Sequence, residues 1–210
     1  MPSFASYPSL KDRPVFVSGG GSGIGASIVE HFAAQGAKVA FVDIDEAAST
    51  ALMARIKAGG HPVPAFAKCD VRDIPAYQSA IASLAARTGP FTVLVNNAAR
   101  DDRHAIEEVT PAYWDERMAV NLRHQYFAIQ SVVPGMRKAG GGSIINFSSV
   151  SYHTMAPKLS VYEGAKAAVV GMTRGLARDL GVDGIRLNIV TPGWIMTQRQ
   201  IDLWLTPEAE

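Results

Sequence analysis

Residues 14–43 have the sequence PVFVSGGGSGIGASIVEHFAAQGAKVAFVD. Two short runs rich in β-branched residues, 14–18 and 38–43, predict strands. The apolar residues between them recur at helical spacing: Ile24, Ile28, Val29 and Phe32. The glycines before this stretch predict a tight turn, and Gly36 is typical of a helix end. The segment therefore predicts a strand, a glycine turn, a helix over 23–36 and a second strand.

The same alternation continues along the chain. Further strands are predicted within 62–67 and at 91–96, 142–148 and 185–190, and further helices at about 46–58, 73–88, 110–138 and 160–180. Six strands separated by helices predict an α/β fold: a Rossmann-type, doubly wound parallel β-sheet with helices covering both faces. No linker or repeat interrupts the pattern, so residues 1–210 are expected to form a single domain.

Composition narrows the function classes. The 210 residues carry 20 Lys and Arg against 19 Asp and Glu, which leaves no broad basic field for nucleic acid or a membrane surface. The single cysteine, Cys69, cannot form an internal disulfide and suits a reducing compartment. No signal peptide or membrane-spanning stretch is predicted, so a cytoplasmic protein is expected. The five histidines show no clustered ligand spacing, so no metal site is expected.

The glycine turn predicts a dinucleotide site. A pyrophosphate can approach a helix N-terminus only where no Cβ obstructs it, and the expected cofactor contacts here are Gly19, Ser22, Gly23 and Ile24. Asp43 ends the second strand twenty residues after Gly23, where a carboxylate accepts the ribose hydroxyls. No Arg or Lys follows Asp43 directly, which favours NAD over NADP. The alternative is a tight turn beside a surface aspartate.

A second constellation follows the fifth predicted strand. Tyr162 and Lys166 are spaced i and i+4 and share one helix face, and Ser149 lies just after the strand. A lysine ammonium about 4 Å away would favour the phenolate by about 4 kcal/mol at an effective dielectric of 20. We therefore expect a lowered pKa for Tyr162 and a role as proton acceptor. The alternative is an exposed pair on a surface helix, but strand C-terminal ends are where ligands bind in such sheets.

Together these residues resemble the short-chain dehydrogenase/reductase family, in its single-domain branch, over about residues 12–197. The resemblance rests on Ser18-Gly19-x-x-x-Gly23-x-Gly25, Asp70-Val71, Asn96-Asn97-Ala98-Ala99, Asn121, Ser149, Tyr162-x-x-x-Lys166 and Pro192-Gly193 with Thr197.

The resemblance implies a role for each matching position. The implied catalytic residues are Asn121, Ser149, Tyr162 and Lys166, with Asn121 holding a water in a proton relay and Lys166 also binding the nicotinamide ribose. The implied cofactor contacts are Asp70 and Val71 at the adenine, Asn97, Ala98 and Ala99 along the cofactor, and Pro192, Ile195 and Thr197 at the nicotinamide. Asn121 has a compatible alternative, a helix-kink residue that bonds its own backbone.

The family pattern continues beyond Glu210 with a further helix and a seventh, edge strand. The chain is therefore expected to be a C-terminally short form of the fold, either a fragment or a naturally shortened protein of doubtful activity. A homodimer or homotetramer is expected of a full-length protein.

Local segments resemble the sugar 1-dehydrogenases of this family, which act on D-xylose, L-arabinose, D-galactose or related aldoses. These segments include Asp101-Asp102-Arg103-His104 and Arg199-Gln200. This implies NAD-dependent oxidation of the C1 hydroxyl of an aldose to an aldonolactone, with Ser149, Ser151, Tyr152 and His153 near the sugar. His153 is alternatively a surface loop residue, and 101–104 is expected to be a solvated charged loop, near a subunit contact.

Two rival functions remain. A 3-oxoacyl or general carbonyl reductase would share every catalytic residue, although such enzymes usually favour NADPH and Asp43 counts against that cofactor. A catalytically silent NAD-binding protein is the rival from another class, and the short C-terminus favours it. Replacing Tyr162 by Phe separates an enzyme from a binding protein.

Overall fold

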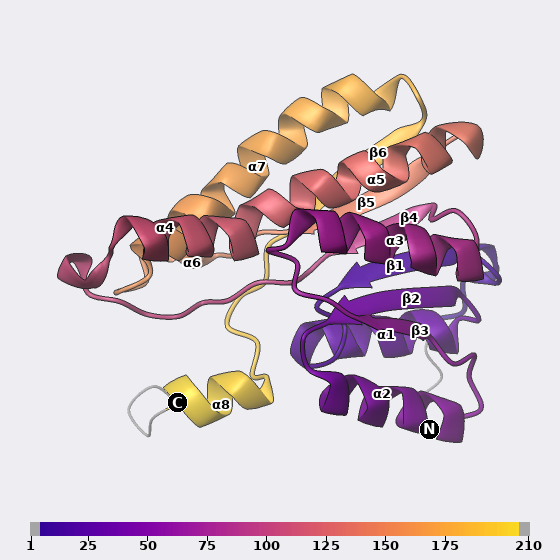
Figure 1. The fold of residues 1–210 in the computed structure, drawn as a ribbon, viewed down its shortest axis with the longest axis horizontal. Helices are drawn as coiled ribbons and strands as arrows, with labels where there is room; N and C mark the ends of the chain where they lie inside the picture. Colours follow the sequence, from indigo (N-terminus) through magenta and orange to yellow (C-terminus); the bar gives the residue numbers. More distant parts are fainter. Residues whose placement is uncertain (1–4, 206–210) are drawn as a thin grey trace.

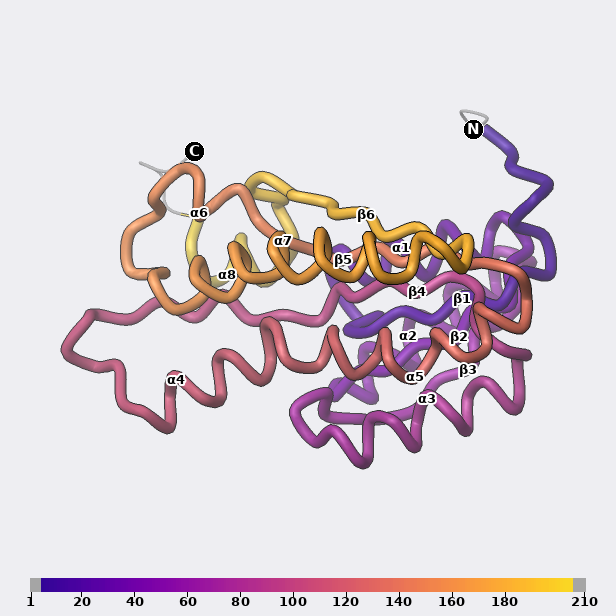
Figure 2. Tube along the Cα trace, turned by 90° about the horizontal axis from the view of Figure 1, so that it is seen from above, coloured from indigo at the N-terminus to yellow at the C-terminus, as the bar shows by residue number. Residues whose placement is uncertain are grey.

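Six parallel strands form one sheet in the computed structural model, which describes residues 5–205 (Figures 1 and 2). The strands are β1 Pro14–Ser18, β2 Lys38–Asp43, β3 Ala65–Lys68, β4 Val93–Asn96, β5 Gly142–Phe147 and β6 Ile185–Val190. Their order in the sheet is β3-β2-β1-β4-β5-β6, and every neighbouring pair is parallel. The predicted doubly wound sheet is thus confirmed, with its switch point between β1 and β4, where such sheets bind ligands.

Helices cover both sides of the sheet. On one side lie α1 Gly23–Ala34 and α2 Glu46–Ala58. On the other lie α3 Ile74–Thr88, α5 His124–Lys138 and α7 Ser160–Gly181. Three shorter helices lie beyond the C-terminal ends of the strands: α4 Pro111–Met118, α6 Ser151–Thr154 and α8 Gln198–Trp204 (Figure 1). Short 3₁₀ turns occupy Pro8–Leu10 and Ile106–Glu108.

Alternate residues of the central strand feed two hydrophobic cores, because successive strand side chains point to opposite faces. Phe16 packs into the core under α3 and α5, with its ring centroid 5.2 Å from that of Phe91 and 6.1 Å from that of Tyr77. Val15 and Val17 pack into the core under α1 and α2. All five residues are fully or almost fully buried, which fixes the register of β1.

Side-chain caps set the start of several helices. Asp45 accepts a hydrogen bond from Ala48 N at the start of α2, and Asp73 accepts one from Ala76 N at the start of α3. Thr197 likewise accepts from the backbone N of Gln200 and begins α8. Each cap satisfies a backbone N–H that the helix leaves without an internal partner.

The structure departs from the predicted elements in several places, among them the short helix α6, which was not predicted. The predicted helix 110–138 is divided by a π-helical turn, Ala119–Arg123, where the Asn121 side chain donates to Arg117 O. The strand predicted at 91–96 begins at Val93, and α8 was not predicted. β6 is also not covered on both faces by the described residues, because its alternate residues Arg186, Asn188 and Val190 are exposed.

No helix within residues 5–205 is long and apolar enough to span a membrane.

Candidate active site

A cleft of about 850 Å³ lies at the C-terminal ends of the strands. The predicted residues that line it are Gly19, Ser22, Gly23, Ile24, Asp43, Asp70, Val71, Asn97, Ala98, Ala99, Ser149, Ser151, Tyr162, Lys166, Pro192, Ile195 and Thr197. Three predicted residues, Asn121, Tyr152 and His153, are not among its lining. The two constellations found separately in the sequence therefore share one cavity.

The glycine turn has a backbone conformation that favours glycine. Gly19 and Gly23 have φ values of +66° and +53°, in the region that favours glycine. A Cβ added to Gly25 would lie 1.8 Å from the carbonyl oxygen of Gly19, so the first turn of α1 packs directly on the loop before it. The turn thus requires glycine for its conformation and for its close contacts.

β4 holds the turn in place. The Ser18 hydroxyl accepts hydrogen bonds from the backbone N of Asn97, at 3.1 Å, and of Ala98, at 3.2 Å. The Asn97 amide in turn donates to the carbonyl oxygens of Ser18 and Gly19. Asn97 and Ala98 are therefore part of the architecture of the turn as well as of the cleft wall.

The N-terminus of α1 opens into this cleft and fits a dinucleotide. Ser22, its N-cap residue, makes no side-chain hydrogen bond to the helix within the described structure. The first N–H groups of α1 thus remain available to an anion, and they carry the positive end of the helix dipole. Together with the absence of a Cβ at Gly23 and Gly25, this is a cradle suited to a pyrophosphate.

Two carboxylates line the end of the cleft where the sequence predicts the adenosine. Asp43 accepts hydrogen bonds from Gly21 N at 2.8 Å and from Asp45 N at 2.9 Å, so backbone groups fix its orientation. Asp70 forms a bidentate ion pair with Arg72, which holds the pKa of the Asp70 carboxyl below its ordinary value. Both side chains place carboxylate oxygens, which are hydrogen-bond acceptors, at this end.

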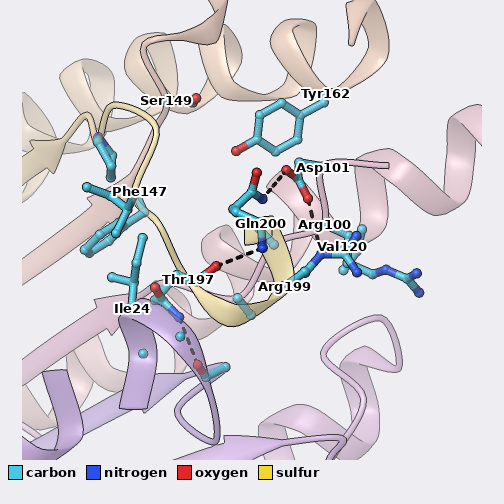
Figure 3. A pocket seen from close by; sticks show the side chains of 18 of the residues that line it. Ile24, Arg100, Asp101, Val120, Phe147, Ser149, Tyr162, Thr197, Arg199 and Gln200 are labelled. Atoms are coloured by element: carbon cyan, nitrogen blue, oxygen red, sulfur yellow. Dashed lines mark hydrogen bonds and ion pairs between the residues drawn. The ribbon is translucent and has the colours of Figure 1, made fainter. Parts of the chain in front are cut away.

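Tyr162, Ser149 and Lys166 lie together at the other end of the cleft. Figure 3 shows the Tyr162 hydroxyl pointing into the cavity, with Ser149 on the same side of the cavity. Lys166 is fully buried, and its Nζ donates to the carbonyl oxygen of Phe147 at 2.8 Å. This Nζ lies 5.5 Å from the centroid of the Tyr162 ring. The α7 helix and the end of β5 therefore bring the predicted catalytic groups to one point.

The expected lowering of the Tyr162 pKa was wrong for this structure. Burial raises the pKa of Tyr162 to about 12, although the Ser149 hydroxyl opposes the shift. Burial also lowers the pKa of Lys166 to about 7, so its charge is itself weakened near neutral pH. The i, i+4 spacing placed both groups on one face, but it did not reveal their burial or the Phe147 contact.

Asn121 serves the backbone around it. Its two amide hydrogens are donated to Arg100 O and Arg117 O, both at 3.0 Å, and its Oδ1 accepts from Arg100 N at 2.9 Å. The side chain thus fastens the loop after β4 to the π-helical turn, as the kink alternative describes. The relay role stays a prediction.

The two other residues outside the cleft lining belong to α6. The rings of Tyr152 and His153 stack on one another with centroids 3.9 Å apart, and His153 is exposed. Ser151, the first residue of the same short helix, lines the cleft and donates from its backbone N to Ser149 Oγ at 3.2 Å. The first and last residues of α6, Ser151 and Thr154, therefore reach the cavity, whereas Tyr152 and His153 between them do not.

The structure brings into the cleft four residues to which the sequence analysis gave no site role, although Asp101, Arg199 and Gln200 lie in segments that carry the sugar-dehydrogenase resemblance. Asp101, Trp194, Arg199 and Gln200 line the cleft, and Arg199 Nη2 donates to Asp102 at 2.7 Å. The expected solvated loop 101–104 is thus partly a cleft wall. His104 in that loop is buried and hydrogen-bonded to Ser160 and Tyr113. One sequence signal could have revealed the α8 helix that carries Arg199 and Gln200. Thr197 lies just before these residues, and threonine is typical of a helix N-cap.

No group of three or more His, Cys, Asp or Glu residues in the described part of the chain is placed to hold a metal ion.

Comparison with known proteins places this site in a family. The family profile described as "Enoyl-(Acyl carrier protein) reductase" matches residues 19–208. The chain is 50% identical over 205 residues to "Probable galactose dehydrogenase GalD" of Rhizobium meliloti (strain 1021), covering 98% of this chain and 80% of that protein. It is also 50% identical over 209 residues to "D-xylose 1-dehydrogenase" of Caulobacter vibrioides, covering 99% and 82%.

Comparison with solved structures leads to the same family. A Serratia marcescens short-chain dehydrogenase/reductase is 34% identical, with a TM-score of 0.88 over 97% of this chain and 81% of that one. A 7α-hydroxysteroid dehydrogenase solved with NADH is 28% identical, with a TM-score of 0.89 over 95% and 77%. The chain therefore belongs to the short-chain dehydrogenase/reductase family, as an oxidoreductase of CH–OH groups that uses a nicotinamide cofactor.

Proposed function

We propose that this protein oxidises the anomeric C1 hydroxyl of an aldose, a pentose or a hexose, to an aldonolactone with NAD. The observation that carries the proposal is the meeting of Ser149, Tyr162 and Lys166 in the same cleft as the glycine turn. The sugar is supported by the two relatives at 50% identity, which are named as a galactose and a xylose dehydrogenase.

Each residue has a defined task in the proposed reaction. Tyr162 accepts the proton of the C1 hydroxyl, and Ser149 hydrogen-bonds the same oxygen and orients it. Lys166 would hold the nicotinamide ribose, while Pro192, Ile195 and Thr197 line the part of the cleft where the nicotinamide would lie. A bound NAD would supply the hydride acceptor for C1. The C1–O bond gains double-bond character as hydride and proton leave, which produces the lactone, and the protein contributes mainly position.

Asp43 supports NAD rather than NADP as the cofactor. Its carboxylate is held by two backbone N–H groups at the end of β2, where it would accept the ribose hydroxyls and repel a 2′-phosphate. Arg72, the cation beside Asp70, already pairs with Asp70 and Glu116. We expect NADH to bind at least about tenfold more tightly than NADPH, a ratio that Asp43→Asn reduces, as fluorescence titration of the two cofactors can measure.

The activity is tested by mixing the protein with NAD and a panel of aldoses while following the absorbance of NADH. We expect turnover of a pentose or hexose, and a fall of at least about 100-fold in Tyr162→Phe because the proton acceptor is lost. NADH binding should be unchanged in that variant. Tyr126→Phe is the matched control, because Tyr126 is exposed on α5 and away from the cleft.

Two outcomes would favour the rivals. Reduction of 3-oxoacyl thioesters with NADPH, without oxidation of any aldose, would assign the protein to the carbonyl reductases. NADH binding without turnover of any alcohol would indicate a silent binding protein.

The pH profile of the reaction follows from the buried phenol. Since burial raises the pKa of Tyr162 to about 12, the proton acceptor is mostly protonated at neutral pH in the free protein. The kcat/KM for aldose oxidation should therefore rise with pH between 7 and 10. A profile that falls over this range would contradict Tyr162 as the proton acceptor.

A further inference from the structure

Three side chains form a continuous hydrogen-bonded row along one wall of the cleft. Trp194 Nε1 donates to Gln200 Oε1 at 2.9 Å, and Gln200 Nε2 donates to Asp101 Oδ2 at 2.7 Å. Trp194 and Gln200 come from the segment after β6, whereas Asp101 comes from the loop after β4. All three line the cavity. Residues about a hundred positions apart are thus joined at one surface of the site.

This row faces the reacting groups. Figure 3 shows the Tyr162 hydroxyl pointing toward Gln200 and Asp101, with Ser149 on the same side of the cavity as Tyr162. Burial raises the pKa of Tyr162 and the charge of Asp101 adds to this shift, while for Lys166 the same charge opposes the lowering of the pKa by burial. A substrate whose reacting carbon sits between Ser149 and Tyr162 therefore extends past this row.

The row has unused hydrogen-bonding capacity. An ionised carboxylate offers about four acceptor positions. Within the described structure Asp101 accepts only from Gln200, at 2.7 Å, and from Arg199 Nε, at 3.4 Å. The Gln200 amide uses one N–H and one lone pair in the row and keeps a second of each. With 23% of the Asp101 side chain exposed, these open positions are accessible from the cleft.

We propose that Asp101 and Gln200, backed by Trp194, form the subsite that recognises the aldose hydroxyls remote from C1; this rests on the proposed function. A carboxylate accepts hydrogen bonds from two neighbouring hydroxyls, and the amide adds a donor and an acceptor. Trp194 is 46% exposed and offers the face of its aromatic ring. The partial negative charge of that face attracts the C–H groups of a sugar ring. The row therefore combines the groups that bind a neutral polyol.

Arg199 positions the subsite. It pairs with Asp101 through Nε and with Asp102 through Nη2. Asp102 in turn pairs with Arg117, whose side chain is almost fully buried. The α8 helix is thus anchored to the loop after β4 through a chain of ion pairs that ends inside the fold, which holds Asp101 toward the cavity. Arg199 acts through Asp101 and is a positioning residue.

The subsite is tested with aldoses that lack a single hydroxyl, such as the 2-, 3- and 4-deoxy analogues. Wild-type protein should lose about tenfold or more in kcat/KM when a recognised hydroxyl is removed, since hydrogen bonds to a charged group are stronger than average. In Asp101→Ala and in Gln200→Leu the parent aldose and one deoxy analogue should react equally, because the partner of that hydroxyl is gone. The Kd of NADH should not change.

This comparison separates recognition from a merely structural role. If Asp101 only holds α8 in place, Asp101→Ala lowers the rates with parent and deoxy aldoses by the same factor, which would overturn the subsite. Asp101→Asn preserves the shape and serves if the alanine variant does not fold. The matched control is Asp202→Asn on α8, whose carboxylate accepts from Gln198 and does not line the cleft. It should keep the wild-type pattern.

The outcomes also distinguish the two proposals. Aldose turnover by wild type, with unchanged discrimination in both variants, overturns the subsite alone. If wild type oxidises no aldose, both the proposed function and the subsite are overturned.

Discussion

The two halves of the cleft are built in different ways. The half under the glycine turn is made of backbone groups and buried contacts: Ser18 is fully buried, and Gly25 lies against the Gly19 carbonyl. The half under α8 is made of side chains on the surface, with Arg199 42% and Trp194 46% exposed. The first half depends on backbone groups and on buried contacts of the glycine turn, and few substitutions would preserve them. The second can change its side chains without disturbing the fold, which suits a site that sets substrate choice.

The two halves should also differ in stability. Exposed ion pairs contribute about 0–1 kcal/mol each, so the contacts of Arg199 hold α8 only weakly. The glycine turn is fixed by hydrogen bonds between Ser18 at the end of β1 and Asn97 just after β4, and both strands are central in the sheet. We expect α8 to open without unfolding of the turn, since binding loops are drawn from the less stable parts of a fold.

The largest expected effect comes from filling the space at the glycine turn. Gly25→Ala should destabilise the protein by about 3 kcal/mol, the upper end of the usual cost of overpacking, because its Cβ meets backbone at 1.8 Å. It should also abolish measurable NADH binding. Gly171→Ala is the matched control: this glycine lies on α7 with nothing within 4 Å of an added Cβ, and alanine there should stabilise by up to about 1 kcal/mol.

Urea unfolding and NADH titration of both variants check this prediction. Equal stability of the two proteins, with cofactor binding retained, would show that the turn tolerates side chains and that the contrast between the halves is wrong.

The next effect concerns the buried support of the cofactor half. His124 is fully buried and its Nε2 donates to Ala98 O at 3.0 Å; burial lowers the pKa of His124 to about 3. The unfolded chain binds a proton at about 6.5 and the folded one does not, so the free energy of unfolding falls as the pH falls below 6.5. By pH 5 the loss should reach about 2 kcal/mol.

Urea unfolding at pH 7 and pH 5 measures this loss, and His124→Gln should remove most of it. The acidic groups with lowered pKa values, Asp70 and Asp102, have ordinary values of 3.8 and contribute only at lower pH. An equal loss in the variant would mean that His124 is not the group that titrates.

The smallest effect on stability is expected in the substrate half. Arg199→Gln should change the free energy of unfolding by less than about 1 kcal/mol, because the guanidinium is largely exposed. It should raise the KM for the aldose several-fold while the Kd of NADH stays constant, as steady-state kinetics and fluorescence titration can show. A destabilisation above about 2 kcal/mol would mean that Arg199 is needed for the stability of the fold, and the two halves of the cleft would then not differ as described.

The sequence predicted the sheet well. The strands predicted at 14–18, 38–43 and 185–190 have those bounds in the structure, because β-branched runs ended by glycine, proline or polar residues leave little choice of boundary. The α8 helix was missed because it has only seven residues and no buried residue within the described structure. Its contacts are with residues about a hundred positions away, which no local pattern reveals.

The candidate site was predicted unevenly for the same reason. Gly19, Asp43 and Tyr162 follow from spacing and from their place at strand ends, and the structure brings them into one cleft. The predicted direction of the Tyr162 pKa shift was wrong, since burial is a property of the folded chain and outweighs the opposing hydrogen bond with Ser149. Asp101 was assigned to a solvated loop because no local pattern reveals its hydrogen bond with Gln200, 99 positions away.

The most direct test of hydride transfer from C1 uses an aldose carrying deuterium at that carbon. With this substrate and NAD, mass spectrometry should find reduced cofactor one mass unit heavier than NADH and a lactone without label. Reduced cofactor without deuterium, formed while the aldose is consumed, would contradict oxidation at the anomeric carbon.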